Sequence, residues 1–189
     1  MPTIVYLHGF NSSPQSHKIG QMRQWLQQHR PDIRLIAPYI AMNAARVAEV
    51  IAEQMALYPD ANLVGSSLGG YYATWASATF GRKAVLINPA VEPYRRFRHY
   101  INTEQQNLYT GEKYILTPEM VAELEPLEAG ELAQPARLWV LLQTGDETLD
   151  YRHAAERYAT SPQLVEQGGD HAFSTFEQHI PAIIHFLSH

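Results

Sequence analysis

The 189-residue sequence contains no cysteine. Disulfide bonds, thiolate metal sites and cysteine nucleophiles are therefore excluded. Long apolar runs are also missing, since no window approaches the ~20 apolar residues of a membrane-spanning helix. The first residues, MPTIVYLHGF, lack a basic start, and their apolar run is too short for a signal peptide. We therefore expect a protein without a membrane span, with the cytoplasm as its default location.

Basic residues are not in excess either. The formal net charge is -5, which argues against nucleic acid as a partner, because phosphate binding normally requires a basic surface. Hydrophobic residues make up 46% of the chain and charged residues 17%, a balance typical of a globular core. Domains commonly span about 100–200 residues. We expect one domain, residues 1–189, whose partner is a small molecule.

The distribution of apolar residues along the chain predicts strands that alternate with helices. Runs of β-branched and aromatic residues predict six strands, at residues 3–9, 34–40, 62–67, 83–90, 136–145 and 162–169. Apolar residues at three- and four-residue steps predict helices at residues 17–29, 43–58, 68–80, 150–159 and 176–187. This alternation is typical of an α/β fold, a parallel sheet with helices on both faces. Ligands then bind at the carboxyl ends of the strands.

The stretch LVGSSLGGYYATWA, residues 63–76, contains two adjacent serines between glycines. Only Ser67 satisfies the pattern G-x-S-x-G, with Gly65 and Gly69 at the flanking positions. Glycines are needed there because a side chain would collide where the strand and the helix approach most closely. We therefore expect Ser67 to be a nucleophile on a sharp strand-to-helix turn and Ser66 to be structural. An ordinary tight turn with an incidental serine is the alternative.

A serine hydroxyl needs a base and an orienting carboxylate to act as a nucleophile. Of the nine histidines, His171 fits best, because it follows the last predicted strand in the loop GGDHAF, while His8 follows the first strand and can order the loop there. Six others lie in or at the ends of predicted helices: His17, His29, His153, His179, His185 and His189. His99 belongs to a basic cluster with Arg95, Arg96 and Arg98. Asp146, directly after the fifth strand, is the preferred acid. Asp150 is its main rival, although it can also cap the next helix.

Acyl transfer by such a serine also needs hydrogen-bond donors for the developing oxyanion. We expect the backbone N–H groups of Leu68 and Phe10 to provide them, since Gly9 lets the loop after the first strand bend toward the sheet. An ordinary strand-ending turn would explain the same loop. Asn11 and Ser12 are candidate substrate-binding residues, although loop capping explains them equally well.

Four motifs together carry a resemblance to a known family: YLHGFNSSP, GSSLGGYYA, LLQTGDE with LDYR, and GGDHAF. With them the whole chain resembles the α/β-hydrolase superfamily and, within it, the small bacterial YqiA-type esterases. The resemblance implies a minimal α/β-hydrolase fold of about six parallel strands, without the two leading strands of larger members. It also implies hydrolysis of carboxylic esters or acyl thioesters by a serine triad, with no metal and no cofactor.

The segment 91–134 shows no strand signal and is too long for a simple connection. In this fold such an insertion often forms a lid over the site. Arg95 and Arg96 within it are candidate contacts for an anionic substrate part, such as a carboxylate or the phosphates of an acyl-CoA. The alternative is a solvated helix face that pairs with the acidic stretch 119–131.

The sequence thus predicts a serine esterase or thioesterase with Ser67, His171 and Asp146 as its triad. Two other functions remain open. The chain can be a non-catalytic ligand-binding protein that keeps the hydrolase fold, because fold alone does not establish activity. It can also be an amidase or peptidase that uses the same triad.

Overall fold

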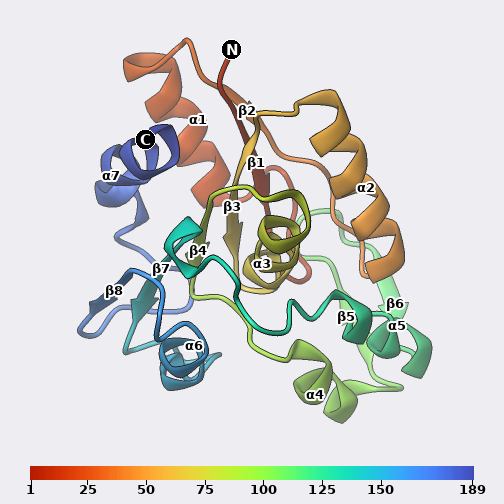
Figure 1. The fold of residues 1–189 in the computed structure, drawn as a ribbon. Helices are drawn as coiled ribbons and strands as arrows, with labels where there is room; N and C mark the ends of the chain where they lie inside the picture. Colours follow the sequence, from red (N-terminus) through yellow and green to blue (C-terminus); the bar gives the residue numbers. More distant parts are fainter.

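The computed structural model describes residues 1–189 and contains eight strands and seven α-helices (Figure 1). The strands are β1 (Thr3–Leu7), β2 (Arg34–Ile36), β3 (Asn62–Ser66), β4 (Ala84–Ile87), β5 (Glu104–Gln106), β6 (Lys113–Ile115), β7 (Leu138–Gln143) and β8 (Gln163–Glu166). The helices are α1 (His17–His29), α2 (Ala44–Leu57), α3 (Leu68–Phe80), α4 (Pro93–Phe97), α5 (Pro118–Ala122), α6 (Tyr151–Arg157) and α7 (Phe176–Ser188).

Six strands form one parallel sheet in the order β2-β1-β3-β4-β7-β8. The predicted six-stranded parallel sheet is therefore confirmed. The chain moves from β1 to the edge strand β2 and then returns to β3 on the other side of β1. This reversal of strand order is the topological switch point, where ligands bind in open α/β sheets.

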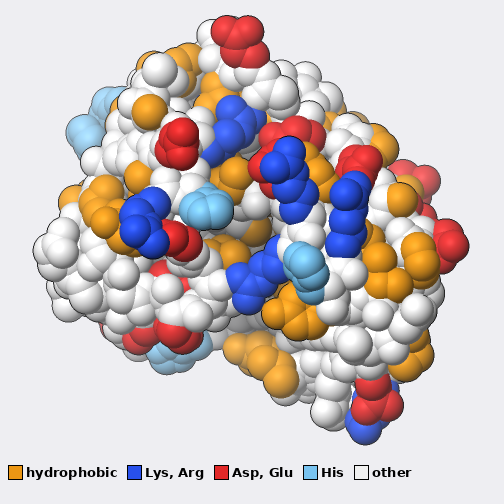
Figure 2. Space-filling view, turned by 90° about the horizontal axis from the view of Figure 1, so that it is seen from below, with side chains coloured by type: hydrophobic (Ala, Val, Ile, Leu, Met, Phe, Trp, Pro, Cys, Tyr) orange, Lys and Arg blue, Asp and Glu red, His pale blue; other side chains and the backbone are white.

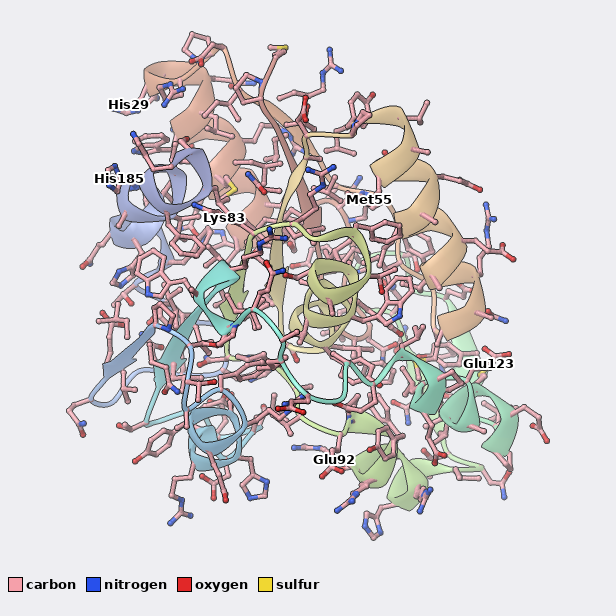
Figure 3. The ribbon with its side chains drawn as sticks, in the orientation of Figure 1. His29, Met55, Lys83, Glu92, Glu123 and His185 are labelled. Atoms are coloured by element: carbon pink, nitrogen blue, oxygen red, sulfur yellow. The ribbon has the colours of Figure 1, made fainter.

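Helices cover both faces of the sheet, as predicted (Figure 1). Alternate residues of each strand point to opposite faces, so that Tyr6 of β1 packs with α1 and α7, whereas Val5 and Leu7 pack with α2, α3 and α6. Each of the two resulting clusters is buried. Met55 of α2, labelled in Figure 3, belongs to the cluster that contains Val5 and Leu7.

The helix ends follow local chemistry. The side chain of Asn43 accepts a hydrogen bond from the backbone N–H of Arg46 at 2.7 Å and caps α2. Gly81, with φ of 67°, ends α3 in the left-handed conformation that favours glycine. No helix is both long and apolar enough to cross a membrane.

Two sequence-based expectations need correction. The strand predicted at 34–40 ends at Ile36, two residues before Pro38, because proline cannot donate to the sheet. The expectation that residues 91–134 contain no strand is wrong, since β5 and β6 form an antiparallel hairpin within them. These strands have three residues each and expose most of their side chains, so they carry little hydrophobic pattern. The Asn107 side chain, which accepts from Tyr109 N and Thr110 N, makes the turn between them.

Candidate active site

Ser67 lies on the turn between β3 and α3, with φ of 54° and ψ of −123°. A non-glycine residue in this region carries backbone strain of about 1–3 kcal/mol, so its surroundings must hold it there. The backbone N–H of Ser67 donates to Ile87 O, and Ser67 O accepts from the N–H of Ala90, both at 3.0 Å. The neighbouring strand β4 and the residues after it thus fix the strained turn and expose the Ser67 hydroxyl at the carboxyl end of the sheet.

The two glycines around Ser67 lie where strand and helix touch. A Cβ on Gly65 would lie 2.2 Å from the carbonyl oxygen of Gly69, and a Cβ on Gly69 would lie 2.0 Å from that of Leu7. Both distances are far below van der Waals contact, and the atoms they meet are backbone. As the sequence analysis expected, the close approach of the backbone leaves no room for a side chain at either position.

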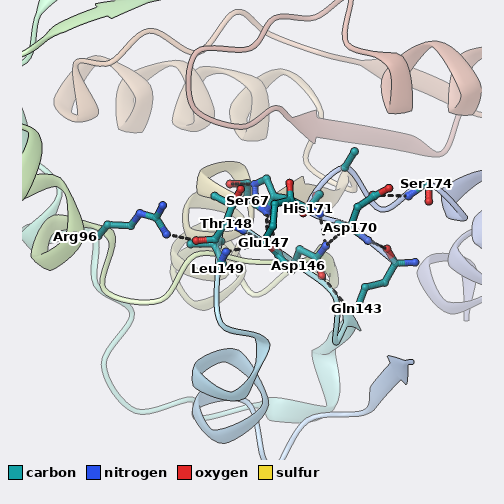
Figure 4. A network of polar contacts seen from close by, with 12 residues as sticks. Ser67, Arg96, Gln143, Asp146, Glu147, Thr148, Leu149, Asp170, His171 and Ser174 are labelled. Atoms are coloured by element: carbon teal, nitrogen blue, oxygen red, sulfur yellow. Dashed lines mark hydrogen bonds and ion pairs between the residues drawn. The ribbon is translucent and has the colours of Figure 1, made fainter. Parts of the chain in front are cut away.

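Ser67, His171 and Asp146 form a continuous chain of hydrogen bonds (Figure 4). Nε2 of His171 lies 3.1 Å from Oγ of Ser67. Its other ring nitrogen, Nδ1, lies 2.8 Å and 3.0 Å from the two carboxylate oxygens of Asp146. Because the carboxylate accepts at Nδ1, it favours the tautomer in which Nε2 is free to take a proton from Ser67.

The carboxylate of Asp146 is 2% exposed and remains ionised in this environment. Burial raises the pKa of Asp146, but hydrogen bonds from His171 and from the N–H groups of Leu149 and Thr148 outweigh that effect. The net pKa therefore lies below its ordinary value. Asp150 instead caps α6, accepting from the N–H of Arg152 at 3.0 Å, and pairs with the guanidinium of that residue. The structure thus separates the two candidate carboxylates.

Three further side chains hold the loop that carries His171. The amide nitrogen of Asn88 donates to the carbonyl oxygens of Asp170 and His171, at 3.1 Å and 3.4 Å. Oε1 of Gln143 accepts from the N–H of Asp170, and Oε2 of Glu147 accepts from the N–H of His171, both at 2.9 Å. Asn88 and Gln143 are themselves linked, because Gln143 N donates to Asn88 Oδ1. The base is thus positioned through its backbone as well as through its ring.

Sequence reasoning did not predict that these three residues hold the loop of His171. Asn88 directly follows β4, Gln143 is the last residue of β7, and Glu147 stands four positions after it. Polar residues at the carboxyl ends of the strands would have been the signal, since that edge of the sheet carries the site.

The expected oxyanion donors lie beside the nucleophile. Leu68 is the first residue of α3, and neither its N–H nor that of Phe10 donates to another backbone group. Both residues line a cavity together with Ser67 and His171. Both N–H groups thus remain available in residues that line the same cavity as Ser67, which is what the expected oxyanion site requires.

His8 orders the loop that contains Phe10. Its Nε2 accepts from the N–H of Ile40 at 2.9 Å, so Nδ1 carries the proton and donates to the carbonyl oxygen of Gly9 at 3.0 Å. The residue is 1% exposed, and burial lowers the pKa of His8. This neutral histidine is structural, as its position after the first strand indicated.

Two cavities meet at Ser67 and His171. The insertion-side cavity, of about 260 Å³, lies under α4 and is mostly apolar, and its wall includes Phe10, Leu68, Val91, Pro93, Phe97 and Leu149. The α1-side cavity, of about 410 Å³, is lined mainly by side chains with polar groups, among them Asn11, Ser12, Ser16, Lys18, Gln21 and Ser174. A substrate bound at Ser67 can therefore place two chemically different parts on opposite sides of the nucleophile.

The insertion 91–134 is tied to the loop after β1. Tyr114 donates to Oδ1 of Asn11 at 2.7 Å, and Asn107 donates to the carbonyl oxygen of Ser12 at 2.9 Å. The ring of Phe97 lies 4.7 Å from that of Phe10, measured between centroids. The insertion thus packs directly over the residues expected to form the oxyanion site.

The arginines of the insertion differ in their placement. Arg96 lines the insertion-side cavity and donates to the carbonyl oxygen of Thr148 (Figure 4). Arg95 is absent from the walls of both cavities and pairs with Glu92 at 2.8 Å. The two residues that the sequence grouped as substrate contacts therefore do not act together.

Of the other histidines, His17 lines the α1-side cavity together with Ser67 and His171. Figure 3 shows His29 and His185 at the end of the molecule opposite α4 and α6. The structure contains no group of three or more histidine, aspartate or glutamate side chains that could hold a metal ion.

Comparison with known sequences gives one family. The model of the family described as "Uncharacterised protein family (UPF0227)" matches residues 3–188. A UPF0227 protein of Shewanella sp. (strain ANA-3) is 31% identical over 191 residues, which cover 95% of this chain and 96% of the relative. The UPF0227 protein of Shewanella oneidensis is 28% identical with the same coverage of both chains.

Comparison with solved structures gives one fold. Est1E from Butyrivibrio proteoclasticus superposes with a TM-score of 0.71 at 16% identity, covering 99% of this chain and 87% of the other. The mouse α/β-hydrolase domain-containing protein 10 superposes with a TM-score of 0.70 at 15% identity, covering 98% and 89%. At such identities the likeness concerns the fold, which is that of the α/β-hydrolases.

Proposed function

Because the chain belongs to the protein family UPF0227 and has the α/β-hydrolase fold, we propose that it is a serine hydrolase of acyl esters or thioesters. Ser67 is the nucleophile, His171 the general base and Asp146 the orienting acid. The observation that carries this proposal is the chain of hydrogen bonds from Ser67 Oγ through both ring nitrogens of His171 to a carboxylate that is 2% exposed.

The reaction proceeds in two halves. Oγ of Ser67 attacks the substrate carbonyl carbon while Nε2 of His171 takes its proton, and the N–H groups of Phe10 and Leu68 stabilise the oxyanion. The bond to the alcohol or thiol breaks, and that group leaves with the proton from His171. Water, deprotonated by His171, then releases the acid from the acyl-enzyme and restores Ser67.

The apolar wall of the insertion-side cavity supports an acyl group as the part bound there. Its volume of about 260 Å³ suits a short or medium acyl chain better than a long one. Structural neighbours include an esterase domain from Rhodothermus marinus, with a TM-score of 0.68 at 16% identity. Ester hydrolysis is thus the activity we place first, and thioester hydrolysis, including that of acyl-CoA, second.

The test is hydrolysis of p-nitrophenyl esters from acetate to palmitate by the wild type and by Ser67→Ala. We expect activity with an optimum at short or medium acyl length, and a loss of more than about 10⁴-fold in the variant. Circular dichroism and the melting temperature of the variant show that it remains folded. Absence of ester and acyl-CoA hydrolysis in the wild type would instead favour a non-catalytic ligand-binding protein.

The amidase alternative is separated by matched substrates. Butyryl p-nitroanilide and p-nitrophenyl butyrate carry the same acyl group on an amide and an ester. Faster turnover of the anilide, relative to the uncatalysed rate of each, would support an amidase and contradict the proposal.

A further inference from the structure

Basic side chains gather around the mouth of the site. Figure 2 shows the molecule from the side on which α4 and α6 lie, with lysine, arginine and histidine side chains around a hollow whose wall is hydrophobic. The chain as a whole carries a net charge of -5, so the basic side chains on this face stand in contrast to the acidic charge of the whole molecule. An anionic part of the substrate would be attracted to it.

Most of these cations already have partners. Arg95 pairs with Glu92, and Arg98 pairs with Glu125. Arg96 has no carboxylate partner, but it lines the apolar insertion-side cavity and donates to the carbonyl oxygen of Thr148. The cation of interest is therefore one on the α1 side of the nucleophile without a carboxylate partner.

Lys18 meets this description. It is partly buried in the first turn of α1 and lines the α1-side cavity together with Ser67 and His171. Its ammonium donates to the carbonyl oxygen of Ala172 at 2.7 Å, and none of the ion pairs in the structure includes it. An ammonium has three donors, so two remain for a ligand.

The surroundings of Lys18 favour an incoming anion. Burial lowers the pKa of Lys18, and the negative charges of Asp170 and Asp146 offset part of that shift. An anion in direct contact would stabilise the charged ammonium further. Neutral donors line the same cavity, namely the side chains of Asn11, Ser12, Ser16, Gln21 and Ser174. The first turn of α1 contains no acidic residue, so the carboxylates that act on Lys18 are those of Asp170 and Asp146. Both already accept hydrogen bonds, Asp170 from Ser174 N and Asp146 from His171.

We propose that Lys18 and the α1-side cavity bind a carboxylate on the alcohol half of the substrate. This inference rests on the proposed function and adds a substrate class to it. His171, which protonates the leaving alcohol, lines both cavities, so the chemical character of each cavity decides the assignment, and the α1-side cavity with its polar side chains takes the alcohol half. The acyl half then occupies the apolar insertion-side cavity. The substrate is an ester between an uncharged acyl group and a hydroxy acid.

The test compares two esters that differ only in charge on the alcohol half. These are the butyrate esters of 3-hydroxybenzoate and of 3-hydroxybenzamide. We expect the wild type to prefer the carboxylate by about tenfold in kcat/KM, since a charge-assisted hydrogen bond supplies roughly that factor. Lys18→Gln should bring the ratio close to one, and Lys18→Arg should retain part of the preference. Lys113→Gln, which removes an exposed lysine of β6, should leave the ratio unchanged.

The ratio of kcat/KM for the two esters distinguishes a Lys18 that binds the carboxylate from a Lys18 that only supports the loop of His171. If Lys18→Gln lowers kcat/KM for both esters equally, Lys18 only holds Ala172 in place and the proposal is wrong. A preference for p-nitrophenyl hydrogen glutarate over p-nitrophenyl butyrate that depends on Lys18 would place the anion on the acyl half and also overturn it. Hydrolysis of p-nitrophenyl butyrate by the wild type, absent in Ser67→Ala, shows in each case that the proposed function itself stands. If neither esters nor acyl-CoA are hydrolysed, both proposals fail together, whereas hydrolysis of acyl-CoA alone contradicts only the inference about Lys18.

Discussion

The carboxylate of Asp146 lies 2.8 Å from Nδ1 of His171 and also accepts two backbone hydrogen bonds, from Thr148 N and Leu149 N. The loop that contains Asp146 therefore fixes the orientation of this carboxylate independently of His171. Asp150 lies four residues further along, at the start of α6, and faces Arg152. The distinction between these two aspartates provides the first prediction.

Asp146→Asn should lower kcat by about 10⁴-fold, because an amide in this position favours the wrong tautomer of His171. Asp150→Asn should leave kcat within about twofold of the wild type and lower the melting temperature only slightly, since asparagine also caps a helix and only the exposed pair with Arg152 is lost. The measurement is steady-state hydrolysis of p-nitrophenyl butyrate, with the melting temperature of each variant. Loss of turnover in Asp150→Asn with full turnover in Asp146→Asn would reverse the assignment.

Gly65→Ala should destabilise the fold by about 3 kcal/mol or more, because the new Cβ would meet the backbone of Gly69 at 2.2 Å. β3 and α3 cannot separate without disturbing Ser67, so activity should fall as well. The free energy of unfolding in urea measures the first effect. Gly20→Ala in α1 is the matched control: a Cβ there meets nothing within 4 Å, and the helix should gain up to about 1 kcal/mol. Equal stability of the two variants would contradict the steric argument.

Asn88→Ala should lower kcat by about 10- to 100-fold with little change in KM, because Asn88 donates to the carbonyl oxygens of Asp170 and His171 and a small shift of the base is costly. Asn88 has φ of 40°, so alanine also adds backbone strain there. Asn102→Ala controls for that strain, since Asn102 has φ of 65° on the insertion, away from the base loop. If both variants lose stability and neither loses kcat, Asn88 is structural only.

Protonation of His8 should destabilise the fold on the acid side. An unfolded histidine titrates near pH 6.5, whereas burial lowers the pKa of His8 in the folded state. Below about pH 6.5 the unfolded chain then binds more protons than the folded one, so stability falls as the pH decreases. His8→Asn removes this titration. Free energies of unfolding at pH 7.5, 6.5 and 5.5 should therefore fall more steeply in the wild type than in the variant, and parallel profiles would refute the argument.

The nucleophile turn and the sheet were accessible to sequence reasoning because their signals are local. Gly65, Ser67 and Gly69 lie within five residues of a single strand-to-helix turn, where close contact dictates the residue types. The four inner strands of the sheet, β1, β3, β4 and β7, are buried on both faces and therefore appear as largely apolar runs. The position of His171 followed from the same logic, since glycines precede it at the end of the last strand.

The remaining features depend on contacts that the sequence does not encode locally. Lys18 reaches the loop of His171 across 154 positions in the chain, and nothing near Lys18 marks it as different from other helix lysines. Arg95 and Arg96 look equivalent in sequence, yet only Arg96 faces the cavity. The hairpin of β5 and β6 was missed because its strands are short and mostly exposed, so the sequence there shows no apolar pattern.

The pairing of β4 with β7 has a consequence for the insertion between them. Ile87 lies opposite Leu141 in the sheet, although more than fifty residues separate them in the chain. Because β4 and β7 pair directly, the segment 91–134 leaves the sheet and returns to it at neighbouring strands. Its length can therefore change without altering the register of the strands that carry Ser67, Asp146 and His171, provided that its contacts with Asn11 and Ser12 are kept. Under the proposed function, changes in the insertion would alter the range of substrates, whereas the strands of the sheet would keep the triad unchanged.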